Sequence, residues 1–337
     1  DLVYSVIAQG FRTHKTPNNF NNDIGVPLTI FGIEENHEAA VIEMGMNHFG
    51  ELDRIATAVR PHIGVISNVG VAHIGLLGSR EGILKAKCEM LDHLDKDGVA
   101  ILNADNDMLQ TLEGKLPQKI KWFGVENKKD FYADEIEVVG LEQTKCTLHT
   151  PIGSVSVIIP VPGEHMVLNA LSAAAVGVEL GLTLEQIKAG IDNFVPTKKR
   201  MTLMKDVNGL TILNDSYNAN PVSMKSALDV LANAEGRKVA VLGTMGELED
   251  YAPAMHKEVG AYAAEKGTDV LICIGKWNDC MEAGAKEGGM TEVYRYETQE
   301  EFWENGLSLI KEGDNVLVKA SLSTGLSRTV DKLQGVN

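Results

Sequence analysis

The chain has 337 residues, enough for two domains, and the composition of a globular protein with a substantial core. Its 47 acidic and 31 basic residues give a formal charge of −16, which argues against nucleic acid or an anionic membrane as the main partner. No apolar run approaches the roughly 20 residues of a membrane span, and no signal peptide is recognisable. The four cysteines form no CxxC pair, which indicates free thiols in a reducing cytoplasm.

The chain opens on an apolar pattern at helical spacing, and residues 1–11 are predicted to be a helix. No capping residue precedes this helix, so we expect further sequence upstream of Asp1. Short apolar runs then alternate with amphipathic stretches, which is the pattern of βαβ units and a mostly parallel sheet. Strands are predicted at 39–45, 62–70, 98–105 and 119–125, and helices at 50–59 and 79–95.

The pattern changes twice further along the chain. Alternating residues over 131–161 predict antiparallel strands, and residues 164–195 predict two helices that are separated near Gly181. The segment VPTKKR (195–200) then predicts a domain boundary, with domains at 1–197 and 198–337. In the second domain, strands are predicted at 202–207, 210–216, 238–244, 270–275 and 315–321, and helices at 221–233, 253–266, 278–287, 298–311 and 324–334.

The predicted fold class is therefore α/β. A central domain has a mostly parallel sheet with a small antiparallel section, and a Rossmann-like C-terminal domain follows it.

Ligands of open parallel sheets bind beyond the carboxyl ends of the strands, and four groups of residues are predicted there: Glu43; Asn68 with His73; Asp215; and the loop 243–250. Adjacent strands would place Glu43 and His73 only about 5 Å apart laterally, which suits a shared divalent metal. Mg²⁺ or Mn²⁺ is favoured over zinc because no thiolate is near. The alternatives are a helix cap or surface ion pair for Glu43 and a hydrogen-bonded loop histidine for His73.

Other polar segments have two interpretations each. The loop 18–25 is rich in side-chain amides but also resembles an ordinary Asx-rich turn. Lys85 and Lys87 lie on a predicted helix and are ordinarily solvated, and Arg200 either holds a phosphate or decorates a linker. No GxxxxGK[ST] loop, GxSxG elbow or HExxH pair occurs in these residues.

Several strings taken together, and in this order, resemble those of the Mur ligases. The resemblance extends over nearly the whole chain. The strings are NNFNNDIGVPLT (18–29), AVIEMGMNHFGEL (40–52), NVGVAHIGLLGSREGILKAKCEML (68–91), GEHMVLNALSAAAV (163–176), KKRM (198–201), NDSYNANPVSMKSAL (214–228) and VLVKAS (316–321).

The family has three domains, and this chain resembles the central and last of them. The resemblance places residue 1 just after the family's phosphate loop. The UDP-sugar-binding domain and the Lys and Thr of that loop are therefore not in these residues. We expect the chain by itself to be an inactive fragment.

The resemblance implies an ATP-dependent ligase of cell-wall peptidoglycan synthesis, a cytoplasmic monomer, whose substrates are UDP-MurNAc-tripeptide and D-Ala-D-Ala. ATP would phosphorylate the terminal carboxylate of the tripeptide, and the dipeptide amine would attack the acyl phosphate. Mg²⁺ would neutralise charge as the phosphoryl group moves.

The resemblance also implies roles for individual residues. Leu322 departs from the family pattern, since a basic residue is usual there. The implied roles are metal binding by Glu43, His73 and carbamylated Lys87, which would also be catalytic; ATP binding by Asn169, Arg200 and Asp215; and substrate contacts by Asn21, Asn22, Asp23, Tyr217, Asn218 and Asn220.

Three alternatives remain open: a folylpolyglutamate-type ligase, a different Mur enzyme, and a non-catalytic remnant that binds a nucleotide or a partner. If the chain is a ligase, ATP should require both domains, with 195–200 as the hinge.

Overall fold

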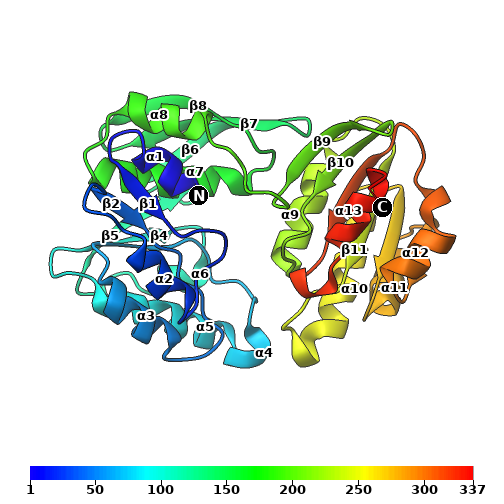
Figure 1. Cartoon of the computed structure of the whole chain (residues 1–337), viewed down its shortest axis with the longest axis horizontal. Helices are drawn as coiled ribbons and strands as arrows, with labels where there is room; N and C mark the ends of the chain where they lie inside the picture. The colour runs from blue at the N-terminus through cyan, green and yellow to red at the C-terminus, as the bar shows by residue number, and fades with distance from the viewer. Residues whose placement is uncertain (337) are drawn as a thin grey trace. The chain divides into compact units, whose positions relative to one another are not determined.

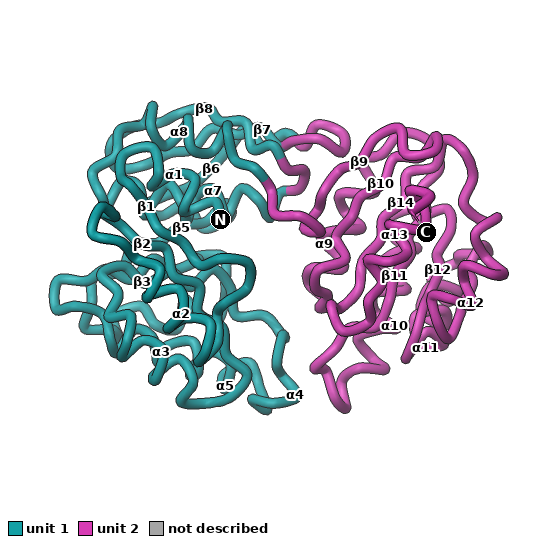
Figure 2. Tube along the Cα trace, viewed as in Figure 1, with its two compact units in different colours: residues 1–137, 144–160, 164–195 teal, residues 138–143, 161–163, 196–337 magenta. Residues whose placement is uncertain are grey.

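A computed structural model describes residues 1–336, which form two compact units (Figures 1 and 2). Unit 1 holds residues 1–137, 144–160 and 164–195. Unit 2 holds residues 138–143 and 161–163 and the chain from Pro196 onward. The domain boundary expected after residue 197 stays a prediction.

Unit 1 contains a six-stranded sheet in the order β3-β4-β5-β6-β7-β8 and a separate two-stranded parallel sheet, β1-β2. Strands β3 to β6 pair in parallel, whereas β7 and β8 pair antiparallel, so the predicted mixture of a parallel sheet and an antiparallel section is confirmed. The strands are β1 (Thr13–Lys15), β2 (Ala39–Val41), β3 (Ile63–Ile66), β4 (Val99–Asn103), β5 (Lys119–Gly124), β6 (Phe131–Val139), β7 (Gln143–Thr150) and β8 (Gly153–Ile159).

The helix α7 forms the core of unit 1, because its small and apolar residues are buried almost all the way round. It packs against β4, β5 and α1. The helices are α1 (Leu2–Ile7), α2 (Gly25–Phe31), α3 (Glu51–Val59), α4 (Ile74–Leu77), α5 (Arg80–Cys88), α6 (Asp107–Gln110), α7 (His165–Glu179) and α8 (Leu184–Asp192), with a 3₁₀ turn η1 (Glu89–His93).

Unit 2 is a doubly wound sheet in the order β13-β12-β11-β14-β10-β9, with only the edge strand β9 antiparallel. Consecutive residues of the strands β11, β12 and β14 are buried, so both faces of the sheet are covered there. Helices α12 and α13 cover one face, and α9 packs against β11 and β14.

The strands of unit 2 are β9 (Thr202–Val207), β10 (Leu210–Asn214), β11 (Lys238–Gly243), β12 (Val270–Ile274), β13 (Val293–Tyr296) and β14 (Asn315–Lys319). Its helices are α9 (Pro221–Ala232), α10 (Ala252–Glu265), α11 (Asn278–Glu287), α12 (Gln299–Asn305) and α13 (Ser327–Leu333), with 3₁₀ turns η2 (Glu249–Tyr251), η3 (Leu307–Leu309) and η4 (Leu322–Thr324).

Two predicted helices run well past the end of the helix that the structure shows. The first helix ends at Ile7 rather than running to residue 11. The helix expected over 298–311 ends at Asn305, where Gly306 leaves the helical conformation with φ −122° and a 3₁₀ turn follows. Two short strands, β1 and β13, were not predicted at all.

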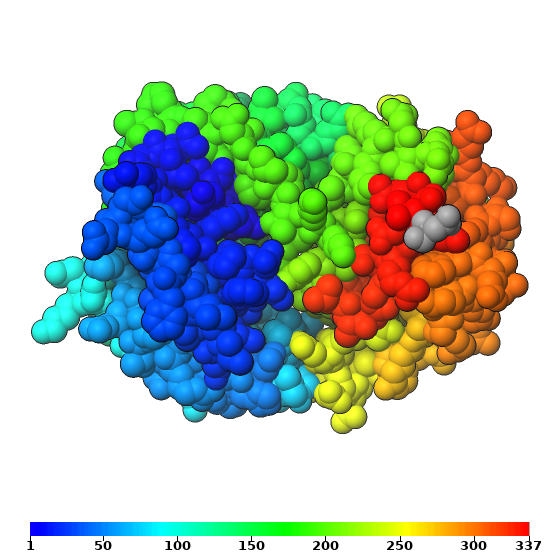
Figure 3. Space-filling model, viewed as in Figure 1, coloured from blue at the N-terminus to red at the C-terminus, as the bar shows by residue number. Residues whose placement is uncertain are grey.

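One face of α2 is apolar and open to solvent. Ile24, Leu28 and Phe31 recur at helical spacing and are 73, 53 and 83% exposed. They belong to the N-terminal part of the chain, which is blue in Figure 3 and forms part of the surface seen there. Among residues 1–336 no helix is long and apolar enough to cross a bilayer.

Candidate functional site

Glu43 follows β2 and is tied to the asparagine-rich loop. Its Oε1 accepts a hydrogen bond from Asn21 Nδ2 at 2.9 Å, and its backbone N–H donates to Thr16 Oγ1 at 2.8 Å. The Glu43 side chain is exposed, so the carboxylate keeps a second oxygen available for another ligand. The structure thus joins two residues that had been assigned separate roles.

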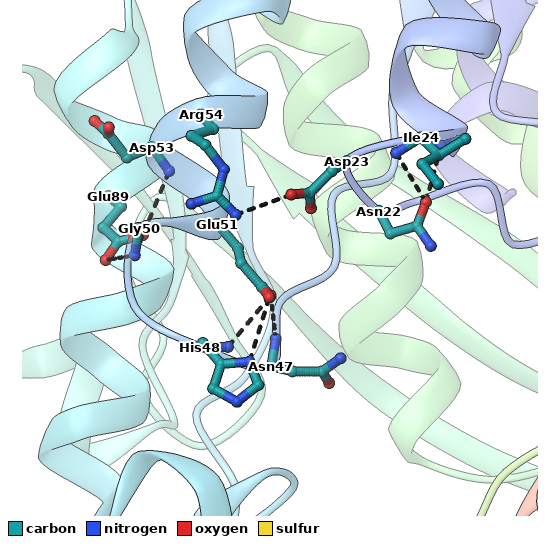
Figure 4. A network of polar contacts seen from close by, with 11 residues as sticks. Asn22, Asp23, Ile24, Asn47, His48, Gly50, Glu51, Asp53, Arg54 and Glu89 are labelled. Atoms are coloured by element: carbon teal, nitrogen blue, oxygen red, sulfur yellow. Dashed lines mark hydrogen bonds and ion pairs between the residues drawn. The ribbon is translucent and has the colours of Figure 1, made fainter.

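The rest of the loop is held by local bonds (Figure 4). Asn22 Oδ1 accepts from the N–H groups of Ile24 and Gly25 at 3.1 and 2.8 Å, which is the Asx turn given as the alternative interpretation. Asp23 accepts from Arg54 Nη2 of α3 at 2.8 Å, and this bond holds the pKa of the Asp23 carboxyl below its usual value.

The start of α3, where Arg54 lies, is fixed by two glutamates (Figure 4). Glu51 Oε2 accepts from the N–H groups of Asn47 and His48 at 2.6 and 3.2 Å. Glu89 accepts from the Gly50 N–H at 2.8 and 3.0 Å, and from the first turn of α3 at 3.3 Å. These carboxylates satisfy N–H groups before and at the start of α3, so the segment after Glu43 is tied to that helix start.

His73 directly precedes α4 and is half-buried in a left-handed conformation, with φ 63°. Helices α4 and α5 contact each other. Gly82 permits this contact, because a Cβ there would lie 2.2 Å from the Leu77 carbonyl oxygen that ends α4. Ser79 caps α5 by accepting from the Gly82 N–H at 3.1 Å. The short connection therefore sets the register of α5.

Lys87 lies on α5 and is partly buried, whereas Lys85 is exposed and lies over the Phe49 ring at 5.6 Å. Within residues 1–336, Lys87 has no hydrogen-bond or ion-pair partner, and desolvation lowers its pKa. A lysine in this state supplies a neutral, nucleophilic amine more readily than a solvated one.

Glu43 and His73 do not follow neighbouring strands, so the expectation that strand spacing places them about 5 Å apart was wrong. Glu43 follows β2, which pairs with β1, while His73 follows β3 of the six-stranded sheet. Within the described chain no group of three or more His, Cys, Asp or Glu residues is placed to hold a metal ion.

Asn169 of α7, the candidate for ATP binding in unit 1, is half-buried and donates a hydrogen bond to Met166 Sδ at 3.5 Å.

In unit 2 the strings KKRM and NDSYNANP come together. Asp215 Oδ1 accepts from the Met201 N–H at 2.9 Å, and the Tyr217 N–H donates to the Lys199 carbonyl at 3.1 Å. The Arg200 guanidinium lies 4.1 Å from the centre of the Tyr217 ring, a cation–π contact. Arg200 is exposed, so its charge remains free to meet an anion.

Sequence reasoning missed Lys319, which forms an ion pair with Asp215 from the end of β14. The side chain of Lys319 is only 2% exposed. The signal that could have found it is a charged residue closing the otherwise apolar run NVLVK.

The remaining candidates have local partners. Asn220 caps α9 in a reciprocal capping box with Ser223, and exposed Asn218 accepts from the Ala219 N–H at 2.8 Å. Leu322 is 50% exposed. In the loop 243–250, Gly246 donates to Ser321 Oγ at 2.8 Å, so this loop is joined to the segment after β14.

Two family models match the chain. The Mur ligase middle domain matches residues 1–177, and the Mur ligase glutamate ligase domain matches residues 199–322. This chain is 35% identical to each of two UDP-N-acetylmuramoyl-tripeptide–D-alanyl-D-alanine ligases, those of Bacillus subtilis and Escherichia coli. The alignments cover 99% of this chain and 72 and 74% of those proteins.

Solved structures agree. A crystal structure of MurF from Acinetobacter baumannii superposes with a TM-score of 0.92 at 34% identity, covering 99% of this chain and 73% of that one. A folylpolyglutamate synthase of Mycobacterium tuberculosis shares the fold alone, with a TM-score of 0.74 at 16% identity over 98% of this chain and 87% of that one.

Proposed function

This chain belongs to the Mur ligase family, and on that premise we propose that it joins D-alanyl-D-alanine to UDP-MurNAc-tripeptide. Members of the family are ATP-dependent peptide ligases. The observation that carries the choice of substrate is the 35% identity to two such ligases over 99% of the chain. The folylpolyglutamate alternative has only a shared fold in its favour. Because the reaction consumes ATP, we propose that the protein acts in the cytoplasm. We also propose that it is a monomer.

The proposed reaction has two steps. The terminal carboxylate of the tripeptide attacks the γ-phosphorus of ATP, which gives an acyl phosphate and ADP. The dipeptide amine then adds to the acyl carbon, and the tetrahedral intermediate expels phosphate as the peptide bond forms. In this scheme Arg200, Asp215 and Asn169 bind ATP. The loop residues Asn21 and Asp23, with the Tyr217–Asn218 turn, contact the other substrates.

We assign Asn22 and Asn220 a supporting part in substrate binding, since each side chain is engaged at the start of a helix. Their contribution would be to shape the loops that carry Asp23 and Asn218.

Mg²⁺ suits the metal candidates on one condition. It prefers oxygen ligands, and Glu43 offers a carboxylate oxygen beside its bond to Asn21. A cationic Lys87 would repel the ion, whereas a carbamate would add two oxygens. The amine of Lys87, which has no partner among residues 1–336, suits that modification. Its nitrogen attacks CO₂, an N–C bond forms, a proton leaves, and the side chain becomes an anion. Glu43, His73 and carbamylated Lys87 would then hold Mg²⁺, which would neutralise charge on the phosphates.

We further propose that these 337 residues alone have no ligase activity, because they contain no GxxxxGK[ST] loop to hold the β- and γ-phosphates of ATP. The test measures phosphate release with ATP and both substrates. Turnover of about 1–100 s⁻¹ by the 337 residues would contradict this proposal. A protein that also carries an in-frame phosphate loop should release phosphate only when D-Ala-D-Ala is present. Release with glutamate and a folate instead would favour the folylpolyglutamate alternative.

A further inference from the structure

Lys319 is a charged residue at the closing position of the central strand β14. It is among the largest fully buried side chains of the described chain. Its Nζ forms an ion pair with Asp215 and donates to the Asn218 backbone carbonyl at 2.8 Å. Both partners lie in the turn that follows β10, so one ammonium holds both ends of that turn.

The position of this pair in the sheet is specific. Strands β10 and β14 pair in parallel, with Asn214 opposite Val318. Asp215 and Lys319 therefore meet one residue beyond the last pair, at the carboxyl end, where ligands of such sheets bind. A buried ion pair adds little net stability compared with apolar packing, because desolvation offsets its attraction. Its value lies in selecting one arrangement of the segments that it joins.

Further bonds extend from this pair to the surface. Asp215 Oδ1 holds the Met201 N–H at 2.9 Å, and the Tyr217 N–H holds the Lys199 carbonyl at 3.1 Å. Arg200, between these two anchored positions, lies against the Tyr217 ring. We propose that Lys319 is a positioning residue that never touches ATP but, through Asp215 and the Asn218 carbonyl, holds Arg200 and Tyr217 where they meet the nucleotide. This inference rests on the proposed role of Arg200 and Asp215 in binding ATP.

The amino end of the same sheet offers a matched control. Arg237, just before β11, forms an ion pair with Asp314, just before β14, at 2.7 Å. The Asp314 side chain is only 3% exposed. This pair joins two strands of the sheet as the Lys319 pair does, but at the end away from the proposed ATP contacts. Loss of Arg237 should weaken the fold of unit 2 without changing the affinity for ATP.

The test compares Lys319→Met with Arg237→Met in the ligase-active protein. Lys319→Met should raise KM for ATP about tenfold while kcat changes less than about twofold, and Arg237→Met should leave KM within about twofold. In the 337-residue chain, hydrogen exchange of the Met201 and Tyr217 amides should accelerate at least tenfold in Lys319→Met only. An unchanged KM and unchanged exchange, or equal effects of both variants, would overturn the proposal.

Two further arms keep the result interpretable. Lys319→Gln retains a neutral hydrogen-bond donor. If Lys319→Met does not fold, KM for ATP and amide exchange are measured in Lys319→Gln instead and tested against the same limits. Arg200→Ala tests the underlying function. If it leaves KM for ATP unchanged, the proposed ATP contact fails whatever Lys319 does. If it raises KM but the Lys319 variants do not, only the positioning role fails.

Discussion

Lys87 in unit 1 and Lys319 in unit 2 are both withdrawn from water, and burial lowers the pKa of each. Their surroundings differ. Lys319 faces the Asp215 carboxylate and the Asn218 carbonyl, while Lys87 has no such partner among residues 1–336. An ammonium with an anion beside it is suited to hold structure. An amine that is desolvated without one is suited to chemistry, because its neutral form is favoured. Burial alone therefore does not distinguish the two roles, but the partner does.

The largest effect should come from removing the unpartnered lysine in the active ligase. Lys87→Ala should reduce acyl phosphate formation at least 10⁴-fold, which corresponds to about 5 kcal/mol, because the metal loses an anionic ligand. Acetate or formate in the buffer should restore part of the rate by filling the vacated site. Lys85→Ala, two residues away and exposed, is the control and should be fully active. Full activity of Lys87→Ala would make Lys87 an ordinary surface lysine.

The same comparison predicts a large loss of stability from one lysine and almost none from the other. Lys319→Met leaves Asp215 without its counter-ion and should lower the free energy of unfolding by about 3–5 kcal/mol. Lys87→Met breaks no ion pair that the structure describes within residues 1–336, so it should change that free energy by less than about 1 kcal/mol. Urea titrations of the 337-residue chain measure both. Equal losses in the two variants would mean that Lys87 has a partner of comparable strength.

A smaller effect is expected from removing Arg200, the exposed cation next to the Lys319–Asp215 ion pair. Arg200→Ala should raise KM for ATP about tenfold, or about 1.4 kcal/mol, since it removes charged hydrogen bonds to phosphate. Stability should fall by less than about 1 kcal/mol, because the lost contact with Tyr217 is a surface cation–π pair. Steady-state kinetics at varied ATP measure the first quantity. Unchanged ATP kinetics would mean that Arg200 does not bind ATP and is only a charged residue of the linker.

The smallest effect is on pH dependence. Lys87 has a folded-state pKa below the unfolded value of 10.5, so the unfolded chain binds more protons between the two values. Stability should therefore rise with pH as it approaches 10.5 from below. The buried Lys319 contributes to the same rise because its pKa is also lowered, so Lys87→Met should reduce the rise only in part, and Lys85→Met should leave it unchanged. The measurement is a series of urea titrations in CO₂-free buffer with a chelator, which keeps Lys87 unmodified. A slope in Lys87→Met equal to that of the unsubstituted chain would mean that Lys87 does not contribute to the rise.

Local patterns predicted most of the elements, but contacts between distant residues were not accessible from the sequence. The helix α3 was predicted because its apolar residues recur at helical spacing and Pro61 follows it. The strand β1, with the sequence THK, has no apolar pattern, and only its pairing with β2 makes it a strand.

The site shows the same limit. Glu43 and Asp215 were singled out because carboxylates at strand ends are unusual. Their partners could not be derived, since Asn21 lies 22 residues from Glu43 and Lys319 lies 104 residues from Asp215. The charged Lys319 closes the otherwise apolar run NVLVK, and this break in the apolar pattern was the one local sign of the ion pair.

The apolar face of α2 bears on how the protein behaves in the test tube. Ile24, Leu28 and Phe31 present apolar area that water solvates poorly, and such patches favour adhesion between copies. At neutral pH the formal charge of −16 keeps copies apart by repulsion. Acidification neutralises carboxylates and removes that repulsion while the patch remains. Precipitation on acidification, relieved by mild detergent, is thus the expected colloidal signature of this one helix face.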